Sequence, residues 1–179
     1  MKSSLIILVA NLVWGSFQIN TQESFVSYTG YHPLHDWTGL SYQLVLETNC
    51  TSVSTNCEAL FNIPINSFNS GNSNRDSNMI YHLNALKYPN VNIKFNNINI
   101  FNNLAINGSK IIDGEINFNN KKQSQKIPLN ISNNDSLLIV SSEFYIDLDK
   151  FDIKRPSLLL IPMKNEVKIN VSIKGFFTD

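Results

Sequence analysis

Hydrophobic and polar residues alternate with a period of two along most of the chain that follows Gly15. This period is typical of β-strands that bury one face and expose the other. Shorter candidates for the same pattern are Phe25–Gly30 and Asp113–Phe118. The clearest runs are Leu40, Tyr42, Leu44 and Leu46; Ala59, Phe61, Ile63 and Ile65; Val91, Ile93 and Phe95; Phe144, Ile146 and Leu148; and Ile169, Val171 and Ile173. The pattern therefore predicts a mostly antiparallel, all-β protein.

One of these runs changes phase. After Phe95 and the pair Asn96-Asn97, the apolar residues resume one position late, as Ile98 and Ile100. A slip of one residue would turn the following side chains to the other face of the sheet. We therefore expect a β-bulge or a strand break at Asn96-Asn97.

A single segment has helical instead of strand spacing. Ser73 and Asp76 have the S-x-x-D spacing of a capping box, and Pro89 would end the helix. The polar stretch before it, Ser67 to Met79, is interpreted as a joint in which the chain turns at Gly71. The apolar residues of the predicted helix are Met79, Ile80, Leu83 and Leu86. So short an apolar face suits a helix that covers one opening of a barrel.

The number of strands favours a barrel over a two-sheet sandwich. The runs amount to about eight strands with no tandem repeat, and closing such a sheet into a barrel removes its exposed edges. The expected architecture is an antiparallel barrel with one short α-helix over an opening.

The N-terminus has the pattern of a secretory signal peptide over residues 1–15. Lys2 supplies the positive charge, Leu5–Gly15 the apolar region, and Val13 and Gly15 the small residues of a cleavage site. The alternative is a retained signal anchor, although the apolar run is shorter than the roughly 20 residues of a spanning helix. We expect a periplasmic or secreted protein without stable membrane insertion, with residues 16–179 as its single domain.

Composition narrows the classes of partner. The chain has 179 residues and is 42% hydrophobic, enough for one domain with a sizeable core. Its 14 Lys and Arg residues balance 14 Asp and Glu residues, so we expect no overall basic field that would attract nucleic acid or an anionic membrane.

The chain has two cysteines, in the polar segment NCTSVSTNC between two strand-like runs. In an exported protein, Cys50 and Cys57 can face each other across the base of a hairpin and form a disulfide. A metal site is the weaker interpretation, because neither a C-x-x-C motif nor a nearby histidine is present.

Three segments carry a resemblance to a known family. The segment SFNSGNSNRDSNMIYHLNALKYPNVNIKF (Ser67–Phe95) resembles the signature of the YceI-like family of exported, lipocalin-like barrels that bind polyisoprenoid or related long-chain lipids. YTGYHPLHDWTG (Tyr28–Gly39) is similar to the family's first strand and turn, and KRPSLLLIPMKNEVKINVSIKG (Lys154–Gly175) to its closing portion. The chain departs from the family where many relatives carry a histidine and this chain has Asn78. It departs again at INFNNKKQSQK (Ile116–Lys126), which replaces a Gly- and Thr-rich segment.

The resemblance implies an apolar tunnel for a long hydrocarbon chain. A barrel of about eight strands either packs solid or leaves such a space, so the same residues can also be ordinary core. The candidate lining residues are Leu44, Leu46, Phe61, Ile63, Ile65, Met79, Leu83, Ile93 and Phe95.

Polar residues near the predicted barrel ends are candidates for contacting a lipid headgroup. His32, His35, Arg75 and Arg155 are the principal candidates. For Arg75, a structural ion pair at the start of the helix is the competing interpretation. Trp37 is expected to plug a barrel end.

Catalysis has little support in the sequence. The motif HPLHD (His32–Asp36) could hold a metal, but on a strand or turn its two histidines would point to opposite sides. No nucleophile motif or phosphate-binding loop is present.

We therefore expect a non-catalytic carrier or storage protein that binds a long-chain lipid and has no other cofactor. Two alternatives stay open: a solid barrel acting as a stress or protein-interaction module, and a small-molecule-processing enzyme. A homodimer also stays open.

Overall fold

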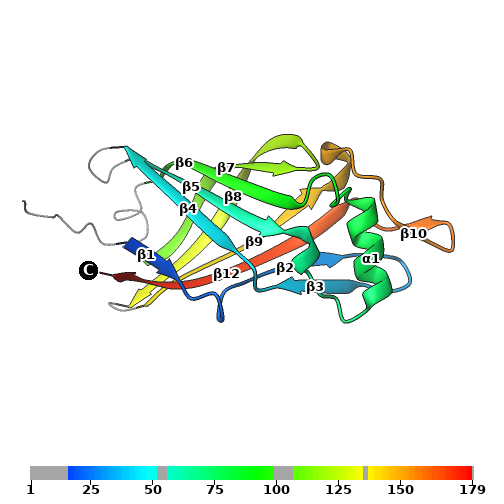
Figure 1. Ribbon diagram of the computed structural model, residues 1–179, viewed down its shortest axis with the longest axis horizontal. Helices are drawn as coiled ribbons and strands as arrows, with labels where there is room; N and C mark the ends of the chain where they lie inside the picture. The colour runs from blue at the N-terminus through cyan, green and yellow to red at the C-terminus, as the bar shows by residue number, and fades with distance from the viewer. Residues whose placement is uncertain (1–15, 52–55, 99–106, 135–136, 179) are drawn as a thin grey trace, which may run out of the picture.

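Ten strands form one antiparallel sheet that curls around an apolar core (Figure 1). The computed structural model describes residues 16–51, 56–98, 107–134 and 137–178. Neighbouring strands follow the order β3-β2-β12-β9-β8-β7-β6-β5-β4, and β1 also pairs with β12. The strands are β1 (Ser16–Ile19), β2 (Phe25–Gly30), β3 (Trp37–Ser41), β4 (Val45–Thr51), β5 (Asn56–Pro64), β6 (Asn90–Ile98), β7 (Gly108–Phe118), β8 (Lys121–Asn134), β9 (Leu137–Asp147) and β12 (Glu166–Thr178).

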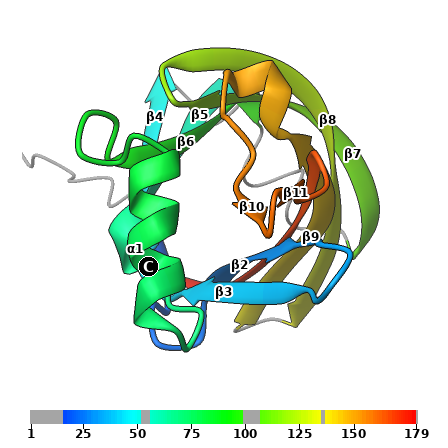
Figure 2. The ribbon, with the colours of Figure 1, turned by 90° about the vertical axis from the view of Figure 1, so that its right-hand side faces the viewer.

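Smaller elements gather at one end of this sheet. Helix α1 lies across that end, and a two-stranded hairpin of β10 and β11 lies opposite it (Figure 2). These elements are α1 (Ser73–His82), β10 (Ser157–Leu158), β11 (Ile161–Pro162) and the 3₁₀ turns η1 (Ile65–Ser67) and η2 (Leu148–Phe151). We call this end the mouth, defined by α1, the β10–β11 hairpin and the β2–β3 loop (residues 31–36).

The structure confirms the predicted antiparallel, lipocalin-like barrel with one helix at an opening. The strand order begins at β3 and ends at β4, and no ladder joins these two strands within the described residues. The segment that leads to α1 crosses this seam instead, because Leu40 and Asn69 exchange two backbone hydrogen bonds of 2.9 Å. The barrel is therefore completed partly by the joint that precedes the helix.

The predicted strand from Leu40 to Leu46 is two strands. Ser41 Oγ accepts a hydrogen bond from the Gln43 backbone N–H at 3.0 Å and contacts Ser67 Oγ at 2.6 Å. Such local bonds compete with a strand ladder, so the chain turns between β3 and β4. Tyr42 is exposed as a result, whereas the alternating pattern had placed it inside the barrel.

The bulge predicted at Asn96-Asn97 is confirmed. On β5 and β6, Cys57 lies opposite Ile98 and Ala59 lies opposite Phe95. One residue of β5 therefore faces two residues of β6. Ile100, the last residue of the pattern, lies outside the described residues.

Strand β8 has no counterpart among the predicted strands. It pairs with β7 through a turn in which Asn119 and Asn120 have φ angles of 49° and 58°. Two left-handed residues in a two-residue loop make a type I′ turn, whose twist matches that of paired strands. Strand β8 was missed because its first part, KKQSQK, is polar and carries no alternating signal.

The N-cap of helix α1 lies one residue before the predicted cap. Asn72, and not Ser73, is the N-cap, and its side-chain oxygen accepts from the Arg75 N–H at 3.1 Å. The Asp76 carboxylate reaches back beyond the cap and accepts from the Ser70 N–H at 3.1 Å. The capping-box assignment was therefore wrong, although it placed the helix start to within one residue.

The helix also ends earlier than its apolar residues indicated. Asn84 has a φ angle of 51°, and the Ala85 N–H donates to the Ile80 carbonyl oxygen at 3.0 Å, which is the Schellman arrangement. Leu86 follows this turn and is 96% exposed. Met79, Ile80 and Leu83 pack against the core as expected, but the inclusion of Leu86 in that face was wrong.

Candidate ligand-binding site

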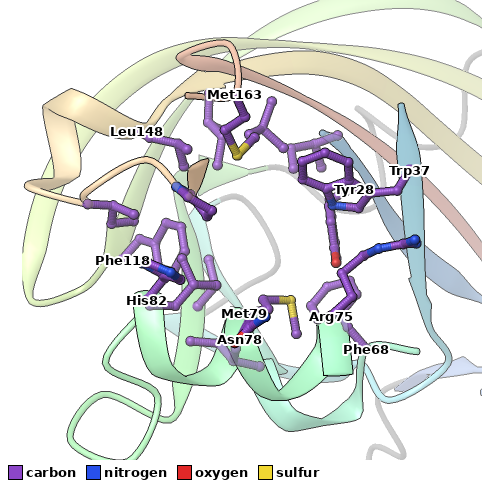
Figure 3. Close-up of a pocket in the computed structure, with 18 of the residues that line it drawn as sticks. Tyr28, Trp37, Phe68, Arg75, Asn78, Met79, His82, Phe118, Leu148 and Met163 are labelled. Carbon is purple, nitrogen blue, oxygen red and sulfur yellow. The ribbon is translucent and has the colours of Figure 1, made fainter. Parts of the chain in front are cut away.

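The barrel interior holds two adjoining cavities. The larger, about 380 Å³, lies at the mouth (Figure 3), and the smaller, about 120 Å³, lies deeper in the barrel. Both are bounded by Val26, Ile63, Ile93 and Phe144. Protein interiors rarely leave voids larger than a water molecule, so this barrel is not packed solid.

Every predicted lining residue borders one of these cavities. Those at the larger cavity are Ile63, Ile65, Met79, Leu83 and Ile93. Those at the smaller cavity are Leu44, Leu46, Phe61, Ile63, Ile93 and Phe95. The alternation of β5 and β6 explains the result, because every second side chain on these strands points to the barrel interior.

The opposite walls were not predicted as lining. They include Phe118 of β7, Phe144 and Ile146 of β9, and Val167 and Ile169 of β12. The same alternation could have identified Phe144, Ile146 and Ile169. Leu148 belongs to the same alternating run as Phe144 and Ile146 and reaches the mouth from η2, whereas no sequence signal pointed to Ser157, Leu158 and Met163 of the hairpin segment.

Tyr28 brings a polar atom into the apolar wall. Its hydroxyl is buried without a hydrogen-bond partner among the described residues, and its ring packs edge-on against Phe68 with centroids 5.4 Å apart. Burial, followed by the Asp76 carboxylate, raises the pKa of Tyr28 to about 12. Arg75 and Trp37 act in the opposite direction on this pKa, although the Trp37 indole makes no hydrogen bond of good geometry with the hydroxyl.

Two glycines make room for the side chains of Tyr28 and Trp37. Gly39 is the register partner of Tyr28, and a Cβ atom there would lie 2.3 Å from the Tyr28 ring. Gly30 is the partner of Trp37, and a Cβ atom there would lie 2.8 Å from the indole. The β2–β3 pair can therefore hold both rings close to the sheet, where they border the larger cavity.

Arg75 of α1 faces β3. Its guanidinium carbon lies 5.8 Å from the centroid of the Trp37 ring, within the range of a cation–π contact. In Figure 3, Arg75 and the Tyr28 hydroxyl lie on the same side of the cavity. Trp37 lines the cavity beside them and does not plug the barrel end.

His32 borders the cavity, but both of its ring nitrogens form hydrogen bonds with backbone atoms. Its Nδ1 atom accepts from the Leu34 N–H at 3.2 Å, so the proton must be on Nε2, which donates to the Ile161 carbonyl oxygen at 2.8 Å. His35 also borders the cavity, with its ring centroid 6.3 Å from that of His32. The expectation that the two histidines point to opposite sides was therefore wrong.

Arg155 lies away from both cavities and pairs weakly with Asp149 at 3.8 Å. Asn78 and His82 of α1 do border the larger cavity, and neither was predicted as a site residue.

Across the described ranges, no group of three or more His, Cys, Asp or Glu side chains converges on a possible metal site. No described helix is long and apolar enough to span a membrane.

A small antiparallel barrel with an apolar interior reached through a polar rim belongs to the class of proteins that can enclose an apolar molecule. The sequence matches the YceI-like domain over residues 17–175, and the chain therefore belongs to that family. No protein of curated function matches the sequence.

Solved structures share this fold at low sequence identity. BcnA of Burkholderia cenocepacia is similar with a TM-score of 0.73 and 14% identity, over 88% of this chain and 99% of that protein. A polyisoprenoid-binding domain of Saccharophagus degradans is similar with a TM-score of 0.71 and 13% identity, over 92% and 100%. A YceI protein of Campylobacter jejuni is similar with a TM-score of 0.58 and 11% identity, over 100% and 94%.

Proposed function

We propose that this protein is an exported, non-catalytic binding protein that holds a polyisoprenoid or another long-chain apolar lipid inside its barrel, as a carrier or store. The observation that carries the proposal is the pair of adjoining cavities with largely apolar walls. Most of the polar side chains that border them gather at the mouth, and those of the inner cavity are Thr48, Lys110 and Ser142. The polyisoprenoid-binding domain of Saccharophagus degradans, which has the same fold, supports this class of ligand.

The apolar chain of the ligand would run from the mouth toward the inner cavity. The side chains of Ile63, Ile93 and Phe144 bound both cavities, so a modest change in their rotamers would join the two spaces. Each buried methylene contributes about 0.8 kcal/mol. Affinity would therefore rise with chain length until the inner cavity is filled.

The polar end of the ligand would stay at the mouth, near Tyr28 and Arg75. The unpartnered Tyr28 hydroxyl could donate to a ligand oxygen, and a buried polar group without a partner is costly. Arg75 stacks on Trp37, which leaves its N–H groups able to bind an alcohol or a phosphate. The ligand would thus be oriented with its polar end outward.

The alternatives fit the site less well. An enzyme would need convergent acid–base groups, yet both ring nitrogens of His32 bond to backbone atoms. A solid interaction module would lack cavities of this size. We therefore favour a binding protein without chemistry at the site.

Export and a disulfide belong to the same proposal. Residues 1–15 would be removed as a signal peptide, which leaves the barrel periplasmic or secreted. Cys50 and Cys57 are register partners on β4 and β5, a placement that supports a bridge between them. Disulfides persist in such oxidising compartments.

Native mass spectrometry of the purified mature protein, before and after organic extraction, tests the ligand. We expect a mass above that of the polypeptide that disappears on extraction and is recovered as an apolar molecule. Only empty protein, including after incubation with prenyl alcohols of several lengths, would contradict the proposal.

A further inference from the structure

The tip of the β10–β11 hairpin is an exposed apolar surface at the mouth. Leu159 is 78% exposed and Leu160 is 96% exposed, and Leu158 and Ile161 beside them are also exposed. We call these four residues the hairpin tip. Figure 1 shows the hairpin extending away from the barrel at the same end as α1. Burying these side chains inside the protein is therefore not their role.

The backbone of the tip is unfavourable for the residues that it carries. Leu159 and Leu160 have φ angles of 51° and 66°, which make a type I′ turn. Such turns strongly favour Asn-Gly, because a bulky side chain is strained in the left-handed region. Two leucines at these positions weaken the turn and expose apolar surface, a combination that indicates a role outside folding.

The charged residues of the hairpin segment, residues 154–164, are all basic. Lys154 and Arg155 precede it and Lys164 follows it, and no acidic residue occurs between positions 154 and 164. Asp149 lies 3.8 Å from Arg155 and offsets part of its charge. An apolar tip between cations is complementary to an anionic bilayer, with acyl chains for the leucines and headgroups for the cations.

The base of the hairpin is held against the barrel. The Met163 N–H closes the hairpin by donating to the Pro156 carbonyl oxygen at 3.0 Å, and the Lys164 N–H ties it to the β2–β3 loop by donating to the Tyr31 carbonyl oxygen at 2.8 Å. The His32 ring bonds to the Ile161 carbonyl oxygen from the neighbouring loop, which also presents the exposed side chain of Leu34. The tip is therefore carried by a fixed base.

The same hairpin also forms part of the cavity wall. Ser157, Leu158 and Met163 border the larger cavity, so its mouth and the exposed tip are continuous. A lipid that left a bilayer beside the tip would meet the cavity without crossing bulk water.

We propose that the hairpin tip docks this protein peripherally onto an anionic lipid bilayer, with the mouth facing the membrane. The use of this contact for loading lipid rests on the proposed function, whereas the docking itself rests only on the hairpin. The leucines enter the interface, and Lys154, Arg155 and Lys164 contact the headgroups.

Flotation of the purified mature protein with vesicles tests the docking. The vesicles are phosphatidylcholine alone and phosphatidylcholine mixed with phosphatidylglycerol, each at low and at physiological salt. The test variant is Leu159→Asn with Leu160→Gly, which gives the type I′ turn its preferred residues while it removes the apolar tip. The matched control is Ile111→Thr, because Ile111 is 69% exposed and lines neither cavity.

The wild type and the control should float with anionic vesicles and partition less well at physiological salt than at low salt. The tip variant should partition at least tenfold more weakly while it unfolds no more easily. Lys164→Gln should weaken binding to anionic vesicles about fivefold and change binding to neutral vesicles little.

Three results would overturn the docking proposal. The first is a wild type that binds no vesicle, and the second is a tip variant that binds as the wild type does. The third is a wild-type dimer that the tip variant dissociates without any change in vesicle binding, which would assign the tip to a protein interface. Lipid content measured on the same samples separates the two proposals: vesicle binding by a protein that never holds lipid refutes only the proposed function.

Discussion

His32 donates from Nε2 to the carbonyl oxygen of Ile161, 2.8 Å away, and so joins the β2–β3 loop to the β10–β11 hairpin across 129 residues of chain. The ring is buried, and its second nitrogen is occupied by the Leu34 N–H. The contact fixes two of the three elements of the mouth relative to each other.

Replacement of His32 by Ala should destabilise the protein by about 1–3 kcal/mol, because it removes a buried ring and leaves two part-buried backbone groups, the Leu34 N–H and the Ile161 carbonyl, without their partner. The loss should appear in chemical denaturation and as faster hydrogen exchange in residues 156–163. His35→Ala is the matched control, since His35 is exposed and has no hydrogen bond among the described residues, and it should change stability by less than about 0.5 kcal/mol. Equal stabilities for the two variants would show that the His32 contact contributes nothing.

Filling the inner cavity should shorten the lipid that the protein accepts. Ala59 is buried in β5 and lines the smaller cavity, so Ala59→Phe would place a ring in that space. Affinity for the longest prenyl alcohols should fall about fourfold for each methylene that is excluded. Binding of a short prenyl alcohol, which fits the larger cavity alone, should not change and serves as the internal control. A uniform loss at every chain length would indicate general damage and not a length limit.

The raised pKa of Tyr28 predicts a loss of stability at high pH. An unfolded tyrosine ionises near its ordinary pKa of 10.0, whereas burial raises the folded-state pKa to about 12. Between these values the unfolded state holds fewer protons than the native state, so stability falls as pH rises from about 10 to 12. The loss is at most about 2–3 kcal/mol, reduced by partial exposure of the ring.

Tyr28→Phe should remove this part of the alkaline slope of the free energy of unfolding. Denaturation curves at intervals from pH 9 to pH 12 measure it. Tyr42→Phe is the matched control for the loss of a tyrosine hydroxyl, because Tyr42 is exposed. Identical slopes for wild type and Tyr28→Phe would place the Tyr28 pKa near its ordinary value.

The proposed Cys50–Cys57 bridge makes its own prediction. Mature protein denatured without reductant should show no free thiol, and Cys50→Ser with Cys57→Ser should cost about 2–3 kcal/mol for so short a loop. The register of β4 and β5 should survive in the double variant, because the ladder there extends from Val45 to Thr51. Two titratable thiols in the secreted protein would refute the bridge.

Most of the strands could be predicted because one face of each strand is buried, and burial imposes a period of two. Phe25–Gly30 has the predicted bounds, and the bulge at Asn96-Asn97 followed from the phase change alone. Strand β8 could not be predicted from its polar first half, since its partners on β7 supply the ladder that holds it. The break after Ser41 depends on a hydroxyl whose second contact, Ser67, lies 26 residues away.

The candidate lining residues could be predicted from the same period of two, whereas the contacts of the polar residues at the mouth could not. Parity along a strand determines whether a side chain points inward, so the sequence alone identified Leu44, Phe61 and Ile93 as interior. It could not distinguish a solid core from cavities, because that depends on how side chains from distant strands meet. The charged neighbours of Tyr28 and the hydrogen-bond partner of His32 on the hairpin could not be predicted either, since α1 and the hairpin approach these residues only in the folded chain.

The sequence by itself determined the β class, the position of the helix and the inward faces of the strands, because burial and local geometry act on neighbouring residues. Only the tertiary structure decided that the interior holds two adjoining cavities and that Arg155 lies outside them. It also decided that the leucines of the β10–β11 hairpin project from the mouth. These outcomes depend on contacts between segments far apart in the chain, which no local pattern encodes.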